Sequence, residues 1–326
     1  MIMKKLLVTI ILLTVCSVHA QTDERETLKQ INQQVVSSYQ NQKLDEAIKF
    51  GQQAVDLSIK IYGRDNRETA AAFTNLGVIY RDKKKFKESI ENLQKAVEVY
   101  RKIPNLTKEL IGVYEALAFS QLLDGKQAES EANYLQAIEI AETAFGKESK
   151  ESFLPTLNLA NFYARDKKFE KADEFYLKSY ALAVKNFGRE TERLTLIEDA
   201  RSCLVGSNIN LEKNKIFDEE RIKIYGEKIS KGNPDVINGG IINGKAKSLP
   251  KPAYPSEARA QRLGGMISVR VKIDEQGNVM EAKTICGHPI LGKASEDSAR
   301  KAKFVPTMLG GKLVKVVGIL VYSFVP

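Results

Sequence analysis

Four similar segments recur along the chain: LDEAIKFGQQAV (44–55), FKESIENLQKAV (86–97), QAESEANYLQAI (127–138) and FEKADEFYLKSY (169–180). Their penultimate residues are all small and lie 42, 41 and 42 positions apart, while the large apolar residues follow the 3.6-residue period of a helix. A unit of this length holds two helices, which cannot bury their apolar faces alone and must stack on the next pair. We therefore expect an all-α solenoid. The small residues are Ala54, Ala96, Ala137 and Ser179.

The units end in glycine turns. IYGRDN (61–66), AFGKES (144–149) and NFGRET (186–191) each place a glycine where a helix is expected to stop. This pattern resembles the tetratricopeptide repeat, and the spacing of about 42 residues with a Tyr-Gly turn resembles its kinesin-light-chain-like form. The resemblance implies a solenoid over residues 21–210, closed after 191 by a capping helix, with a concave groove that binds peptides.

Candidate groove residues lie on the first helix of each repeat. Asn75 and Asn158 occupy equivalent positions, and the resemblance implies that such an Asn contacts the backbone of a bound peptide. A side-chain amide can donate and accept hydrogen bonds at once, but it can equally bond a neighbouring helix. Arg81 and Asn161 are further candidates for the same groove.

The last part of the chain changes to strand patterning. AYPSEAR (253–259) begins a helix, MISVRVKID (266–274) alternates as a half-buried strand, and NVMEAKTIC (278–286) returns from a turn. A helix over GHPILGKASEDSARKAKF (287–304) precedes a long β-branched strand, KLVKVVGILVYSFV (312–325). The predicted order is α-β-β-α-β.

This tail, residues 253–326, resembles the C-terminal domain of the TonB family. The resemblance implies a small α+β fold with a three-stranded antiparallel sheet, a periplasmic location, and capture of a short motif of outer-membrane receptors by β-strand addition. It also makes Tyr254, Pro255 and Arg259 candidate partner-binding residues. The matching features, in order, are Tyr254-Pro255 with Ala258-Arg259, Gly265, Asp274 with Gly277 and Val279, Gly287-His288-Pro289 with Leu291, Ala299, Phe304 with Pro306, Gly311 and Phe324.

A long last strand leaves unpaired backbone groups on a sheet edge, and such an edge recognises an extended peptide. We therefore expect the last strand to be the docking strand and proline at position 316 to abolish partner capture. The candidate edge residues are Val314, Val316, Gly318, Leu320 and Tyr322.

Residues 211–252 read as a charged linker. Within it, GGIINGKAK (239–247) is one residue short of a phosphate-binding loop and has Ala246 where a hydroxyl is needed, so we expect a flexible turn there and no nucleotide site.

The N-terminus has the pattern of an export signal. Lys4 and Lys5 precede an apolar run of 13 residues, and Val18-His19-Ala20 suits a signal peptidase. We expect a cleaved signal peptide over residues 1–20. An uncleaved inner-membrane anchor and a lipoprotein signal at Cys16 stay open as alternatives, although the run is short for a bilayer span.

The formal net charge of +9 is concentrated at the C-terminal end. Residues 238–326 hold 14 basic and 6 acidic residues, whereas residues 21–237 are close to neutral. This favours an acidic partner segment or an anionic surface, and the lack of aromatic residues interleaved on a basic face argues against nucleic acid.

After the leader the chain keeps one histidine, His288, and two cysteines, Cys203 and Cys286. These cannot build a catalytic triad or a closed metal site, so we expect no enzyme activity, cofactor, metal or small-molecule substrate. We expect His288 to serve a helix cap or turn, and the two cysteines, which fall in different predicted domains, to stay unpaired.

These features together predict a non-enzymatic adaptor of the periplasm. The repeats would hold one protein partner, and the TonB-like domain would bind an outer-membrane receptor or another envelope protein. The alternative is an energy transducer for outer-membrane transport, in which an uncleaved N-terminus meets an ExbB/ExbD-like proton motor.

Overall fold

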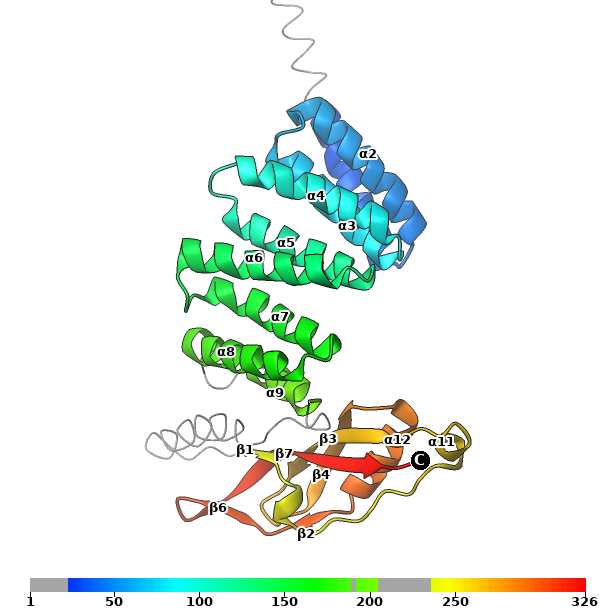
Figure 1. The fold of residues 1–326 in the computed structure, drawn as a ribbon, viewed down its shortest axis with the longest axis vertical. Coiled ribbons are helices and arrows are strands. Elements are labelled where there is room, and N and C mark those ends of the chain that lie inside the picture. The colour runs from blue at the N-terminus through cyan, green and yellow to red at the C-terminus, as the bar shows by residue number, and fades with distance from the viewer. Residues whose placement is uncertain (1–22, 189–191, 205–235) are drawn as a thin grey trace, which may run out of the picture. The chain divides into compact units, whose positions relative to one another are not determined.

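The computed structural model describes residues 23–188, 192–204 and 236–326 (Figure 1). The chain divides into two compact units between Phe162 and Tyr163. The expected signal peptide, with Cys16 and His19, and the linker up to residue 235 lie outside the described residues. No helix in the described ranges is long and apolar enough to cross a membrane.

The first unit is built from paired antiparallel helices. A helix over residues 23–40 is followed by five more helices and one 3-10 turn, and α7 ends just inside the second unit. The predicted helical solenoid is confirmed, with turns at the predicted places. The elements are α2 (Leu44–Tyr62), α3 (Arg67–Asp82), α4 (Phe86–Lys102), α5 (Thr107–Leu123), α6 (Gln127–Phe145), η1 (Lys150–Ser152) and α7 (Phe153–Arg165).

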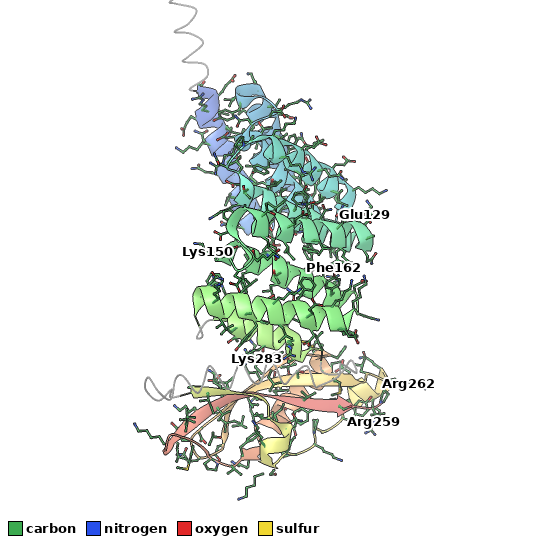
Figure 2. The ribbon with its side chains drawn as sticks, turned by 60° about the vertical axis from the view of Figure 1, so that its left-hand side comes forward. Glu129, Lys150, Phe162, Arg259, Arg262 and Lys283 are labelled. Carbon is green, nitrogen blue, oxygen red and sulfur yellow. The ribbon has the colours of Figure 1, made fainter. Side chains whose placement is uncertain are left out.

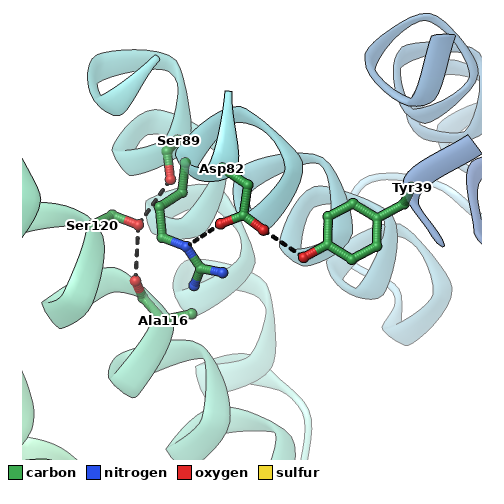
Figure 3. Close-up of polar contacts among 6 residues, drawn as sticks. Tyr39, Asp82, Ser89, Ala116 and Ser120 are labelled. Atoms are coloured by element: carbon green, nitrogen blue, oxygen red, sulfur yellow. Dashed lines mark hydrogen bonds and ion pairs between the residues drawn. The ribbon is translucent and has the colours of Figure 1, made fainter. Parts of the chain in front are cut away.

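Small residues let these helices approach closely. A Cβ atom added to Gly77 of α3 would lie 2.7 Å from Cγ of Leu93 on α4, so only glycine fits there. Between α4 and α5 the hydroxyl oxygens of Ser89 and Ser120 are 2.9 Å apart, and Ser120 also donates to the carbonyl of Ala116 on its own helix (Figure 3). All four small repeat residues are buried as expected: Ala54, Ala96, Ala137 and Ser179.

The glycine turns also take their predicted form. Gly63, Gly146 and Gly188 have φ of 84°, 94° and 83°, a region that other residues rarely adopt. Each glycine N–H donates to the carbonyl four residues back and closes the last helical turn.

The second unit contains two helices and the C-terminal domain. The helices are α8 (Phe169–Phe187) and α9 (Glu192–Ser202), and α9 lies where a capping helix is predicted. The domain adds β1 (Val236–Ile241), η3 (Asn243–Lys245), β2 (Ala246–Ser248), α11 (Ser256–Ala260), β3 (Gly265–Ile273), β4 (Val279–Cys286), α12 (Pro289–Ala299), β5 (Lys303–Phe304), β6 (Thr307–Leu309) and β7 (Lys312–Phe324).

The strand order of the main sheet is β1-β7-β3-β4, with β6 also paired to β7 (Figure 1). The antiparallel set β7-β3-β4 is the predicted three-stranded sheet, and its order in the sequence is as predicted. Helix α12 covers one face, where Leu291 packs with Val269, Val271 and Leu320, all four fully buried.

Two expectations about the domain border are wrong. Residues 236–241 form β1, which pairs in parallel with β7, so this part of the expected linker belongs to the sheet. Gly239, expected in a flexible turn, is a residue of this strand. A Cβ atom there would lie 3.0 Å from Cγ1 of Val316, so the close approach of the two strands leaves no room for a side chain.

Candidate protein-interaction sites

The outer flank of β7 is covered by the chain itself. On the side of β7 away from β3, β1 pairs with residues 315–319 through a register that shifts between Asn238 and Gly240. The expectation that β7 is an open edge is therefore wrong. β7 pairs with β1, a segment about 80 residues earlier in the chain, and the sequence of β7 does not predict this pairing.

Asn243 extends this cover beyond β1. Its side-chain Nδ2 donates to the carbonyl of Val321 at 2.6 Å, and its Oδ1 accepts from the N–H of Val321 at 2.8 Å. The side-chain amide thus takes the place of a peptide unit in an added strand. Just before it, Ile242 donates its N–H to the carbonyl of Ile319 at 3.0 Å and buries its side chain against Gly318.

The predicted edge residues lie in the core, on the face that α12 covers. Val314, Val316, Leu320 and Tyr322 are each less than a tenth exposed, and a Cβ atom on Gly318 would lie 2.6 Å from Ile242. Any partner strand on this flank would meet main-chain groups, not these side chains.

The flank that each β7 backbone group faces follows from its neighbours. Ile319 and Val321 bond residues of the β1 side, and consecutive strand residues point their N–H and C=O groups to opposite flanks. The groups of Val316 therefore face β3. A proline at 316 would break the domain's own sheet, and the test of docking belongs at Val321.

The opposite edge strand, β4, is covered by α12. The Arg300 guanidinium donates to the carbonyl of Ala282 at 3.0 Å, and the N–H of Thr284 donates to the Glu296 carboxylate at 2.7 Å. The hydrogen bond from Thr284 lowers the pKa of Glu296, so the Glu296 carboxylate that accepts this bond stays ionised.

The family-motif residues anchor α11. The Tyr254 hydroxyl donates to the carbonyl of Leu263 at 2.7 Å, and its ring meets that of Phe324 edge-on at 5.9 Å. Pro255 caps α11, and the Arg259 guanidinium lies 5.5 Å from the Tyr254 ring. Arg259 stays exposed and lies with Arg262 at the α11 end of the domain (Figure 2). Of the three residues, Arg259 presents a charge to solvent.

Asn75 lies in an open groove of the first unit. The groove has a volume of ≈ 740 Å³ and runs between the helix over residues 23–40, the end of α2 and α3. Its lining mixes amides and charges with a few apolar side chains, which suits the backbone of a peptide. Lining residues include Asn32, Gln33, Gln40, Glu68 and Asn75.

The other groove candidates are held by neighbouring helices. Asn158 Nδ2 donates to the Glu115 carboxylate at 2.6 Å, which is the neighbouring-helix alternative stated above. The Arg81 guanidinium bonds Asp82 at 2.8 Å and lies 5.2 Å from the Phe119 ring, while Asp82 also accepts from Tyr39 (Figure 3). Asn161 is exposed on α7.

Burial raises the pKa of Glu115 to about 7, and the bond from Asn158 offsets part of that rise. A raised carboxyl pKa means that stability is greatest below about pH 4.5 and falls until the pH passes about 7. We expect Glu115→Gln to remove this dependence and to stabilise the repeats by about 3 kcal/mol at pH 8, with little change at pH 4.5. Urea unfolding followed by helical circular dichroism at both pH values measures it.

The matched control for Glu115 is Glu109→Gln on the same helix, which breaks a solvent-facing pair with Arg67 and is expected to change stability by about 0.5 kcal/mol or less. Equal stabilisation of the Glu115→Gln protein at both pH values would contradict the assignment of the pH dependence to this carboxyl.

His288 is the N-cap of α12, as predicted, with its Nδ1 accepting from the N–H of Ile290 at 3.4 Å. In the described part of the chain no three His, Cys, Asp or Glu side chains gather as a metal site would require.

The sequence analysis did not predict the roles of Ile242 and Asn243. The run Ile-Ile-Asn could have indicated a strand, but glycines on both sides of it favour a turn.

Two family models match separate parts of the chain. Residues 33–102 match the tetratricopeptide repeat, and residues 250–326 match the Gram-negative bacterial TonB protein C-terminal. The chain is therefore a tetratricopeptide-repeat solenoid followed by a TonB C-terminal-type domain. Both families are non-catalytic and act in protein–protein interaction, and the second is a family of the Gram-negative envelope.

Solved structures show a likeness of fold for the repeats. The chain resembles a single-substitution form of a Podosopora anserina protein with nearly identical TPR-like repeats of kinesin light chain type. The two are 16% identical with a TM-score of 0.50, and the match covers 63% of this chain and 96% of that one. It also resembles the apo form of RapI, at 15% identity and a TM-score of 0.51, covering 63% and 72%. No curated protein sequence matches the chain.

Proposed function

We propose that this protein is a non-enzymatic adaptor of the periplasm. Its repeats hold one protein through the groove beside Asn75, and its C-terminal domain captures an extended segment of an outer-membrane receptor or another envelope protein by strand addition. The partner strand takes the place that β1 and Asn243 occupy on β7.

The observation that carries this proposal is the nature of the β7 cover. β1 is a short parallel strand with an irregular register, and at Val321 a single side chain replaces a strand altogether. A flank covered in this way already accepts an added strand, and a longer regular strand would make more main-chain bonds there.

Charge supports the same proposal. The 14 basic and 6 acidic residues of positions 238–326 give the domain a net positive charge, which speeds encounter with acidic segments. Arg259 and Arg262 contribute two of these charges at one end of the domain (Figure 2).

The proposal is tested with a photo-crosslinking amino acid at Ser323, an exposed β7 residue next to the Asn243 cap. We expect Asn243→Ala to raise crosslinking to an envelope protein in native cells about fivefold, because two hydrogen bonds of the intramolecular cover are lost. We expect Val321→Pro to abolish it, because proline removes the donor that faces the partner and leaves the β3 ladder intact. Mass spectrometry identifies the crosslinked protein.

The control is Lys245→Ala, an exposed residue of the same 3-10 turn that bonds no strand and should leave crosslinking unchanged. Undiminished crosslinking by a folded Val321→Pro protein would show that the partner does not add to β7.

A further inference from the structure

Two thiols that are distant in the sequence meet in the second unit. Cys203 directly follows α9, and Cys286 is the last residue of β4. Both belong to the unit Tyr163–Pro326, and both are partly exposed free thiols. We expected the two cysteines to stay unpaired because they fall in different predicted domains. In the structure both belong to one compact unit, so this argument no longer applies.

The main chain around the thiols fixes their proximity. The Ser268 hydroxyl donates to the carbonyl of Ser202 at 3.3 Å, and Ser268 stands opposite Cys286 in the β3–β4 ladder. The Cα atoms of such antiparallel partners are about 4.5–5.5 Å apart. Cys203 is the residue after Ser202, so it is held beside Cys286, and its own thiol donates to the carbonyl of Asp199 at 3.4 Å.

A second attachment holds α9 in this place. The Arg270 guanidinium of β3 bonds the Asp199 carboxylate and donates to the carbonyl of Thr195 at 3.2 Å. Both acceptors belong to α9. Two β3 residues, spaced so that they lie on one face of the sheet, therefore position the helix end that carries Cys203.

The thiols differ in acidity. The neighbouring Cys203 thiol lowers the pKa of Cys286, whereas the Cys286 neighbour and burial raise the pKa of Cys203. Cys286 is therefore the more acidic of the two thiols, and the thiolate is the form that attacks a disulfide.

We propose that Cys203 and Cys286 form a disulfide that clamps α9 to the end of β4. The oxidant is a disulfide-bearing thiol–disulfide exchange partner. The Cys286 thiolate attacks one sulfur of that disulfide and expels the other as a thiolate. Cys203 then loses its proton to water and attacks Sγ of Cys286, which releases the first sulfur. Two protein thiols become one disulfide, and the oxidant gains the two electrons.

The clamp closes a long loop. Its ends are 83 residues apart in the sequence, and cross-linking such a loop strongly restricts the unfolded chain. Oxidation would therefore tie the end of the repeat array to the sheet that carries β7, and reduction would release it. This inference does not depend on the partner of either domain.

The test uses the full-length chain, reduced and then equilibrated in a buffer of oxidised and reduced glutathione. Free thiols are blocked with N-ethylmaleimide before digestion with trypsin without reductant. Peptides 202–213 and 284–293 each hold one of the two cysteines. We expect them to be recovered joined, in about tenfold excess over the blocked forms, and the oxidised protein to melt roughly 5–10 °C above the reduced one.

Cys203→Ser provides the control. We expect its Cys286 to be recovered blocked or as a glutathione adduct, and its melting temperature to match that of the reduced wild type in both buffers. Recovery of both wild-type peptides unjoined in the oxidising buffer would overturn the proposal, and so would joined peptides that come only from linked pairs of chains.

Discussion

Replacing Asp173 by alanine is expected to lower the free energy of unfolding of the helices by about 3–5 kcal/mol. Asp173 on α8 bonds the Arg201 guanidinium on α9 through both oxygens, at 2.5 and 3.4 Å, and the two side chains are 3% and 10% exposed. Without the carboxylate, a guanidinium that is shielded from water loses the bidentate ion pair that Asp173 provides. Urea unfolding followed by helical circular dichroism measures the loss.

The chain offers a matched control on the same helix. Glu174 pairs with Lys178 at 2.8 Å, but both side chains are more than half exposed. Glu174→Ala should therefore cost about 0.5 kcal/mol or less. If Asp173→Ala cost no more than this control, the α8–α9 pair would not hold the capping helix.

Leu320→Ala is expected to destabilise the C-terminal domain by about 2–5 kcal/mol. Leu320 is fully buried in the central strand β7, where it packs in one core with Val269 and Leu291. The truncation leaves a cavity between the sheet and α12. Hydrogen exchange of β3 and β7 peptides, read by mass spectrometry, reports the loss as faster global opening.

Leu313→Ala, in the same strand but with a side chain that is 48% exposed, is the control and should leave exchange nearly unchanged. The pair also separates two roles for Leu320. A docking side chain would change partner capture and leave hydrogen exchange as it was, and that result would contradict its place in the core.

Local patterns in the sequence predict most of this fold. Helices appear wherever small and large residues repeat at helical spacing, and glycine ends them at Gly63, Gly146 and Gly188. The bond between Asn158 and Glu115 joins residues 43 positions apart, close to one repeat, so the period itself makes them neighbours. Such contacts are regular and need no knowledge of distant pairing.

The features that the sequence did not predict depend on pairing between distant segments. β1 carries two adjacent glycines and lacks strand alternation, and it is a strand because β7, about 80 residues later, accepts it. From the sequence alone, Asn243 is typical of a turn, and its role in capping β7 depends on its hydrogen bond with Val321. Cys203 and Cys286 likewise meet only because β3 holds α9. No local pattern encodes any of these three pairings.

The parallel course of β1 along β7 has a mechanical meaning. A partner strand in its place would lie along β7, so an axial load would strain every pair of the ladder together. A sideways load would open the pairs one at a time from one end. The same complex would withstand a larger force applied along the strand than one applied across it. The force needed to separate the partner would then depend on the direction of pulling, although the binding affinity would be the same.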